Sequence, residues 1–414
     1  MADVTKPILL DETGKALVER MDRQNAILSI MAAEKKQAMY ESLAQIADVV
    51  RSNTVEQNAI IFPVGSKIVV PWIDKANNNT EYSMVFNVAH HKTVELVDGS
   101  QVPGMIIQSH YATPYGVQFS NYQAFYNAES AALPAGDYNI ILGTTWGNKD
   151  CVANTKVSFT TTVEVPQGGR LCGLYGLPDQ VSSNWKIYSY AADGKTLLET
   201  INVTIGDNGG TNLGTMYSNK NDEGLNFMQQ VAYGYNRWKE SAMRQWLNSG
   251  AAAGAWWTPQ SKYDIAPTEA PTKPGFLSGF DEDFLSAIRA VKVQTAANTL
   301  TDGGVTDITY DKFFCPSIEE IFSTPQASGV EGEAWDYWKL ALERTTPTGT
   351  GSSNKYPAYI HYALENHSSA QTVRLRSAYR GLGYYAWYVA STGYVHANTH
   401  AVNSFRCAPA CVIC

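Results

Sequence analysis

The 414-residue chain lacks the features that mark secreted and membrane proteins. It has no run of about 18 or more uncharged apolar residues, the length that a helix needs to span a bilayer. Its first residues, MADVTKPILLDETGK, contain no apolar stretch of the kind found in signal peptides. We therefore expect synthesis in a cytosol and no membrane insertion.

Positive charge and cysteine are also scarce. Lys and Arg number 31 against 39 Asp and Glu, which gives a net charge of −8. A nucleic-acid surface needs a basic patch, and no Lys/Arg-rich run is present, so we expect no nucleic-acid partner. The six cysteines are too few and too scattered for a disulfide framework.

Motifs that carry chemistry are missing as well. The patterns G-x-S-x-G, H-E-x-x-H and the P-loop do not occur. Cys407, Cys411 and Cys414 have the spacing C-x3-C-x2-C, for which zinc binding and buried thiols are both open, and the lack of a matching His/Cys pair nearby favours thiols. The stretch TDGGVTD (301–307) is the nearest candidate for calcium, but a plain glycine turn is favoured. We expect no metal, no cofactor and no catalytic residue.

The closing segment uses a narrow alphabet. From Thr372 to Cys414 there is no Lys, Glu, Gln or Met, although all four are common upstream. The segment is rich in Tyr, Ala and Asn, and its only tryptophan is Trp387. Tyr brings a large contact area at a small cost in rotamer freedom, which is why binding surfaces collect it. A tightly packed, strand-rich end that avoids long polar side chains is the other interpretation.

Residues 11–52 have the pattern of a helix. Gly and Pro are absent after Gly14. Apolar residues recur at spacings of three and four, at Leu17, Met21, Leu28, Met31, Met39, Leu43, Ile46 and Val50. Most such stripes pack a helix against its own domain. Because this segment precedes a strand-rich body, we predict instead a helical stalk for attachment and oligomerisation over residues 1–58.

Strand patterns follow the predicted stalk. Residues 59–133 contain β-branched runs between Gly, Pro and Asn, such as IIFPVGSKIVVPWI. A second strand cluster covers residues 134–206, and its ADGK turn is a strong hairpin signal. We predict that this cluster is a small β subdomain inserted into the body. Helical patterns return in GLNFMQQVAYGYNRWKESAMRQWLNSG and DEDFLSAIRAV, and Ser317 with Glu320 predicts a helix start.

Several short sequence motifs follow one another in a fixed order: SAMRQWLNS, WWTPQSKYD, PGFLSGFDEDFLSAI, YDKFFCPSIEEIF, VRLRSA, YYAWYVASTG and SFRCAPACVI. Together they resemble a C-type-lectin-like domain, of the formylglycine-generating-enzyme subtype, found in gut bacteria and their prophages. The resemblance implies an α+β fold in which residues 59–133 and 207–414 are the two parts of the lectin-like domain. The start, TKPILLDETGKAL, resembles the head or tail fibre proteins of gut phages.

One branch of this family consists of the variable proteins of diversity-generating retroelements. In these systems a reverse transcriptase corrupts adenines of a template, which scatters AAC-type codons near the 3′ end of the target gene. Codons of the form NNY encode none of Lys, Glu, Gln, Met and Trp; the closing segment lacks the first four, and its one tryptophan, Trp387, stands where the resemblance implies a fixed position. The resemblance therefore implies a variable region over residues 374–410.

Fixed and variable positions should interleave in such a region, because alternation along a strand points one set into the core and the other into solvent. The predicted frame is Arg376, Ala386, Trp387, Val389, Gly393, Val395, Ala401 and Arg406. Gly393 should lie in a turn with positive φ, and the two arginines should donate hydrogen bonds to buried carbonyls. The predicted display residues are Tyr379, Leu382, Tyr384, Tyr385, Tyr388, Tyr394, His396, Asn398, His400, Asn403 and Phe405. Exposed Tyr, Asn and His are typical of antibody paratopes.

An enzymatic function is the competing hypothesis. The lectin-like subtype takes its name from an oxidase that uses a cysteine pair, and Cys407 and Cys411 offer one. They lie in a closing strand where variable proteins carry the same cysteines, so we expect no oxidase activity. Capsule hydrolysis needs two carboxylates, but the acidic clusters at 281–283 and 319–320 begin predicted helices and need no catalytic role.

The sequence thus predicts a phage or prophage virion protein, not an enzyme, that binds a host-surface protein or glycan through its closing segment. Symmetric copies would gain from avidity, and a trimer is the usual expectation for a fibre. The N-terminal helix would join other virion proteins. The alternative is a bacterial surface-display or carbohydrate-binding protein of the same fold, and a capsule-degrading hydrolase is the third hypothesis.

Overall fold

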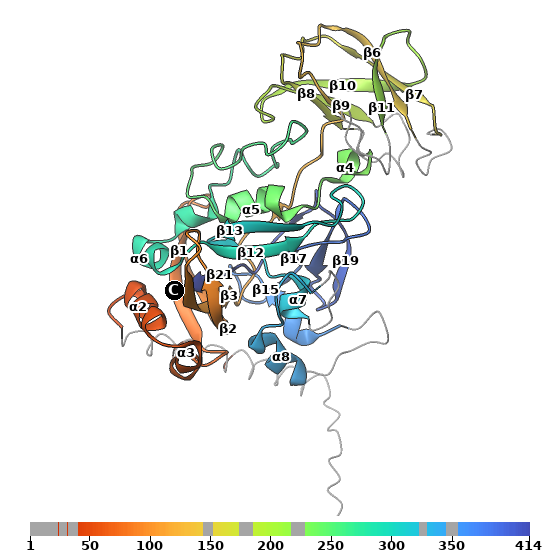
Figure 1. The fold of residues 1–414 in the computed structure, drawn as a ribbon. Coiled ribbons are helices and arrows are strands. Elements are labelled where there is room, and N and C mark those ends of the chain that lie inside the picture. The colour runs from red at the N-terminus through yellow and green to blue at the C-terminus, as the bar shows by residue number, and fades with distance from the viewer. Residues whose placement is uncertain are drawn as a thin grey trace, which may run out of the picture.

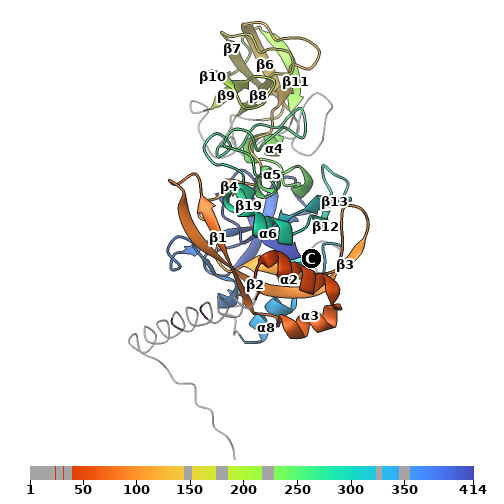
Figure 2. The same ribbon diagram turned by 90° about the vertical axis from the view of Figure 1, so that its left-hand side faces the viewer.

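The computed structural model describes residues 24, 31, 40–143, 152–173, 185–216, 228–322, 329–344 and 355–414. Within these ranges the chain is an α+β protein in which short helices surround several sheets, as predicted. A small all-β unit projects from a larger body, with α4 (Met228–Tyr233) and α5 (Ala242–Leu247) between them (Figure 1, Figure 2). Each part has a hydrophobic core of its own.

The body is built on a five-stranded sheet with the strand order β1-β2-β3-β21-β14. Its strands are β1 (Lys67–Asp74), β2 (Thr80–Glu95), β3 (Gln101–Ser109), β14 (Phe313–Phe314) and β21 (Ala410–Ile413). β21 pairs with both β3 and β14, and all four of its residues are buried. A strand that follows the predicted display residues in the chain therefore lies inside the main sheet.

The N-terminal stripe packs into the body where the structure describes it. α2 (Leu43–Ser52) buries Leu43, Ile46 and Val50 in the core, at 5%, 2% and 0% exposure. The carboxylate of Asp283 accepts hydrogen bonds from the main-chain N–H groups of residues 43 and 44, at 2.8 and 3.1 Å. α3 (Val55–Ile61) follows and begins with a capping box. The predicted stalk is therefore wrong for residues 43–58, while residues 1–39, except 24 and 31, lie outside the described ranges.

The small unit is a seven-stranded sheet with the order β11-β6-β7-β10-β9-β8-β5. Its strands are β5 (Tyr126–Asn127), β6 (Gly136–Leu142), β7 (Lys156–Thr161), β8 (Arg170–Gly173), β9 (Lys186–Tyr190), β10 (Leu197–Ile205) and β11 (Thr211–Met216). The ADGK turn joins β9 to β10, with Gly194 at φ +66°. The sheet covers more of the chain than the predicted range 134–206, because Phe125 and Met216 lie in its core.

The helices of the body are shorter than the sequence pattern suggests. Gly234, at φ +80°, ends α4, and the 3-10 turn η2 (Trp238–Glu240) separates it from α5. α6 (Glu282–Ala287) starts from Asp281 as its N-cap, and α7 (Ile318–Ile321) has the capping box of Ser317 and Glu320. The other elements are η3 (Phe276–Gly279), β12 (Val291–Ala296), β13 (Thr306–Asp311), α8 (Asp336–Glu343), η5 (Pro357–Tyr359), β15 (His361–Tyr362) and β16 (Ala370–Gln371).

The closing segment forms a three-stranded antiparallel sheet on the body. Its strands are β17 (Val373–Ala378), β18 (Tyr385–Val389) and β19 (Val395–His400), in the order β17-β18-β19. β17 is buried along its whole length, whereas most residues of β18 and β19 are partly exposed, with Ala386, Val389 and Ala397 buried. β20 (Ser404–Phe405) then pairs with β4 (Val117–Gln118). Among the described residues, no helix is long and apolar enough to cross a membrane.

Candidate functional site

The hairpin of β18 and β19 carries most of the predicted display residues on one surface. Tyr385 is paired with His400, and Tyr388 with His396, so their side chains lie opposite each other across the two strands. Every one of the eleven predicted display residues is partly or fully exposed, and Tyr379 reaches 40%. We call the surface formed by these eleven residues the display face.

Aromatic rings at one end of the display face form a continuous group. The imidazole of His400 stacks with two phenol rings, with centroids 4.0 Å from Tyr233 and 5.3 Å from Tyr385. Tyr384 contacts Tyr385 edge to face at 4.4 Å and lies 5.3 Å from Tyr233. Tyr233 belongs to α4 and was not among the predicted site residues. Tyr233 is therefore the one member of this ring group that the sequence did not indicate.

Two further ring pairs lie on the display face. The ring of Tyr388 lies 5.8 Å from Phe405, and its hydroxyl donates a hydrogen bond of 2.8 Å to the side-chain oxygen of Asn398. Tyr394 and His396 form the second pair, with ring centroids 5.1 Å apart. The face therefore presents ring edges, hydroxyls, imidazole nitrogens and an amide, the mixture found in protein-binding loops.

Arg374 binds the main chain of this hairpin from the buried side, and it was not among the predicted frame residues. It is 0% exposed, and its guanidinium donates to the main-chain oxygens of Ala386, Thr399, His400 and Asn403, at 3.1, 3.4, 2.8 and 3.4 Å. The planar fork of an arginine suits several acceptors at once. The motif VRLRSA contained this residue, but its pattern could not show which of the two arginines faces the hairpin.

Asn236 holds the turn before β18 in the same way. It is 0% exposed, and its side-chain amide donates to the main-chain oxygens of Leu382 and Tyr385 at 2.7 Å each and of Tyr379 at 3.3 Å. Its own main-chain N–H donates to the oxygen of Gly383 at 3.2 Å. The turn is therefore fixed through atoms that every amino acid has.

The two arginines of the predicted frame have different surroundings. Arg376 is 1% exposed and donates to the carbonyls of Cys315 and Glu331 at 3.1 and 2.6 Å, and it also pairs with the carboxylate of Glu320. Arg406 donates to the Thr113 carbonyl at 2.9 Å. It also forms a two-bond ion pair with the carboxylate of Glu365, at 2.7 Å for each bond. Both arginines donate to carbonyls, as expected, but each also has a carboxylate partner that the sequence did not indicate.

Burial changes the acid–base properties of the Arg376 site. The carboxyl of Glu331 is 1% exposed and accepts a hydrogen bond from the main-chain N–H of Ala296 at 3.0 Å and another from the Ser377 hydroxyl. Loss of water around this carboxyl raises its pKa to about 7, although Arg376 acts in the opposite direction. The group is a buried structural carboxyl rather than a surface acid.

The remaining frame positions are a glycine in a turn, three buried side chains and two side chains at the edge of the core. Gly393 has φ +77°, and an added Cβ would come within 2.2 Å of the carbonyl oxygen of Tyr356, so both conformation and space require glycine. The side chains of Ala386, Val389 and Ala401 are fully or almost fully buried. Trp387 and Val395 are partly exposed, although they pack against the core, so they lie at its edge.

Both acidic residues of the TDGGVTD stretch already have partners. Within the TDGGVTD stretch, Gly303 and Gly304 have φ +63° and +69°, which makes it a glycine turn. Its carboxylates pair with neighbours: Asp302 with the hydroxyl of Tyr235, and Asp307 with the guanidinium of Arg237 at 2.7 and 2.8 Å. In the described part of the chain, no group of three or more His, Cys, Asp and Glu could hold a metal ion. Cys407, Cys411 and Cys414 are buried free thiols.

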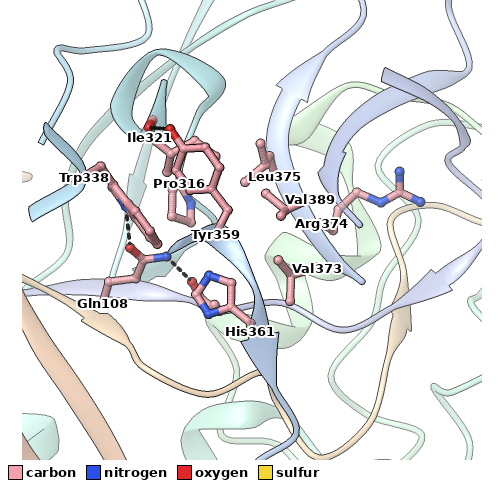
Figure 3. A pocket seen from close by; sticks show the side chains of 11 residues that line it. Gln108, Pro316, Ile321, Trp338, Tyr359, His361, Val373, Arg374, Leu375 and Val389 are labelled. Atoms are coloured by element: carbon pink, nitrogen blue, oxygen red, sulfur yellow. Dashed lines mark hydrogen bonds between the residues drawn. The ribbon is translucent and has the colours of Figure 1, made fainter. Parts of the chain in front are cut away.

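Three cavities of the protein are lined by residues outside the display face. A cavity of about 10 Å³ lies beside Gln108, Trp338, Tyr359 and His361, which is room for about one water molecule. In Figure 3 the guanidinium of Arg374 points away from the Trp338 and Tyr359 rings of this cavity. A second cavity of about 60 Å³ and an open groove of about 680 Å³ are also lined by residues outside the display face.

Comparison with known proteins gives one family and no function. Residues 193–414, more than half of the chain, match a family described as a domain of unknown function, DUF6273. The match covers the display face together with Tyr233, Asn236 and Arg374. No curated protein and no solved structure matches the chain significantly.

Proposed function

We propose that this chain, which belongs to the DUF6273 family, is a binding protein whose display face contacts a ligand on the surface of a host cell. In this proposal it is a phage or prophage virion protein, and the closing segment is diversified by a retroelement. It has a C-type-lectin-like fold and no catalytic activity. Its partners are a host-surface molecule and, through the N-terminal segment, other virion proteins.

One observation carries the proposal: the main chain of the display face is held independently of its side chains. Asn236 and Arg374, both buried, donate to seven main-chain oxygens between residues 379 and 403. The display side chains themselves are at least partly exposed. A surface built in this way can change its side chains while it keeps its shape, which is what a diversified binding site requires.

The competing hypotheses have weaker support in the geometry. A hydrolase would need two free carboxylates about 5–10 Å apart in a cleft. Asp281 instead caps α6, Asp283 binds α2, and Glu320 pairs with Arg376. A bacterial surface-display or carbohydrate-binding protein would use the same face, so it remains the alternative within the same mechanism.

Replacement of four display side chains tests the proposal. Tyr384, Tyr385, Tyr394 and His396 are changed together to Ala, and binding of the labelled protein to cells of the bacterium that carries the gene is measured by flow cytometry. We expect binding to fall to background, because aromatic anchors each contribute about 2 kcal/mol or more. The variant should still melt cooperatively at a modestly lower temperature, because the four side chains are half-buried and each ring pair contributes about 0.5–1.5 kcal/mol.

A matched quadruple variant provides the control. It changes four other exposed residues, Val97, Leu197, Ile308 and Tyr362, to Ala. This control should bind like the parent. If the display variant binds as well as the control, the display face is not the binding site.

The genetic part of the proposal has its own test. Diversification by a retroelement predicts a reverse transcriptase gene nearby and a near-copy of the coding sequence for residues 374–410. Reads from a natural population should then differ at codons that bear adenine in the template, while the codons of Trp387 and Gly393 stay constant. Substitutions spread evenly over the gene would contradict diversification and leave the binding proposal standing.

A further inference from the structure

The ring group on the display face includes one residue from outside the closing segment. Tyr233 ends α4, about 150 residues before the display residues in the chain. Its ring stacks on His400 with centroids 4.0 Å apart and an angle of 18° between the planes, and it lies 5.3 Å from the ring of Tyr384. Because Tyr233 is itself partly exposed, it enlarges the same surface.

Tyr233 and the helix that carries it contact both the small unit and the display turn. Its ring packs against the core of the small unit, and its main-chain oxygen accepts a hydrogen bond from Val402 at 2.9 Å. Gln230, one turn earlier in α4, donates to the main-chain oxygen of Gly383 at 3.3 Å. α4 is thus attached both to the small unit and to the display turn, which holds the ring in a set position.

We propose that Tyr233 is a ligand-contacting residue, a constant aromatic anchor beside the changeable display residues, and that the ligand is a protein surface. This inference rests on the proposed function and adds to it the partner class and a binding residue outside the closing segment. A constant ring would give every variant a common share of binding energy, and the display residues would supply the specificity. Tyrosine suits this role because it binds well to many different surfaces.

The extent and shape of the face favour a protein as the ligand. Ring groups follow one another along β18 and β19, and a six-residue strand such as β19 is roughly 20 Å long. Small ligands bind mainly in concave pockets of several hundred Å³. The three cavities described above, of about 10, 60 and 680 Å³, are lined by other residues. The face also has the Tyr, His and Asn composition of protein-binding loops.

The test compares three variants of one residue. Tyr233→Ala removes the ring, Tyr233→Leu keeps apolar bulk against the small unit, and Tyr233→Phe keeps the ring without its hydroxyl. Binding to cells of the bacterium that carries the gene is measured by titration of the labelled protein. We expect both Tyr233→Ala and Tyr233→Leu to raise the apparent Kd by about tenfold or more, as loss of an anchor does. Tyr233→Phe should stay within about threefold of the parent.

Two controls separate the outcomes. Tyr362→Ala removes an exposed tyrosine, 41% accessible, from β15 and should leave binding unchanged. If Tyr233→Leu folds and binds like the parent while the quadruple display variant does not bind, Tyr233 is no anchor and the proposed function survives. If neither Tyr233→Leu nor the quadruple display variant loses binding, both proposals fail.

The partner class is tested on the cells themselves. Cells shaved with protease should lose the binding of the parent protein, whereas cells oxidised with periodate, which destroys surface sugars, should retain it. Loss of binding after periodate alone would identify a glycan and overturn the protein assignment.

Discussion

Arg374 and Asn236 show how single buried residues can fix the main chain beneath an exposed surface. Both are 0% exposed, and the side chains of both donate hydrogen bonds to main-chain oxygens of the display strands and turn. Leaving such buried acceptors without donors costs about 1–3 kcal/mol each. The two side chains therefore stabilise a backbone shape mainly through main-chain atoms, although the guanidinium of Arg374 also lies 4.6 Å from the ring centroid of the display residue Phe405.

The turn between β18 and β19 should be sensitive to a single methyl group. Gly393→Ala adds a Cβ that would lie 2.2 Å from the Tyr356 carbonyl oxygen, on a backbone with φ +77°. We expect the free energy of unfolding to fall by about 2–4 kcal/mol, measured by denaturant titration. Gly254→Ala is the matched control, because Gly254 has φ +82° and open space around it. Equal losses in both variants would show that the contact with Tyr356 has no cost.

Stability should depend on pH through Glu331. Burial raises the pKa of this carboxyl to about 7, above its usual value of 4.5. Between those values the folded state holds a proton that the unfolded state has lost, so stability falls as pH rises and the loss is complete above about pH 7. The expected loss from this group is on the order of 3 kcal/mol.

Glu331→Gln isolates this effect. The amide can still accept from the Ala296 N–H, but it does not titrate. Melting temperatures of the parent and the variant should diverge from pH 5 to pH 8, with the variant losing less. Glu240, whose pKa burial also raises to about 7, remains in both proteins and does not affect the difference. Parallel curves would contradict the assignment.

At the scale of elements, α2 shows what a sequence pattern can and cannot decide. The spacing of Leu43, Ile46 and Val50 indicates a helix with one apolar side, and the structure contains that helix. The same stripe fits a neighbouring subunit or the protein's own core, because both offer an apolar surface. Asp283, which caps the helix from 240 positions away, decides in favour of the core, and no local signal could reveal that contact.

Truncations should separate the two roles of the N-terminal region. Removal of residues 1–39 should leave the melting temperature close to that of the full chain, since α2 and its cap remain. Removal of residues 1–57 exposes the surface that Leu43, Ile46 and Val50 cover, and burial of each such side chain contributes about 1.5–3 kcal/mol. We expect the longer truncation to lose cooperative melting in circular dichroism. Similar melting of both truncations would mean that α2 is dispensable.

The sequence predicted the strands, the capping box at Ser317 and the exposed character of the display residues more easily than the contacts between them. Ala386 and Val389 could be assigned to the interior as small and apolar residues, and both are buried although they lie three residues apart, because the pairing of β18 with β19 shifts register between Ala386 and Tyr388. Tyr233 and Asn236 meet the closing segment only because the chain folds back after about 150 residues. Such long-range contacts leave no periodic trace in one sequence.

On the scale of the whole molecule, two separate cores should unfold separately. The core of the small unit contains Phe159, and the core of the body contains Phe276. Replacement of a buried phenylalanine by alanine costs about 3–5 kcal/mol. Calorimetry should resolve two transitions, one lowered by Phe159→Ala and the other by Phe276→Ala. A single transition that both substitutions shift equally would show that the small unit and the body unfold as one.

The position of β21 has a consequence for translation. β21 fills the place between β3 and β14, yet a ribosome makes it only after it has read every display codon. A frameshift or premature stop anywhere between residues 379 and 405 removes this strand and leaves a gap in the main sheet. We therefore expect chains made from such faulty copies to fold poorly and to be degraded. The proteins that remain would be those whose display codons were read in frame to the end.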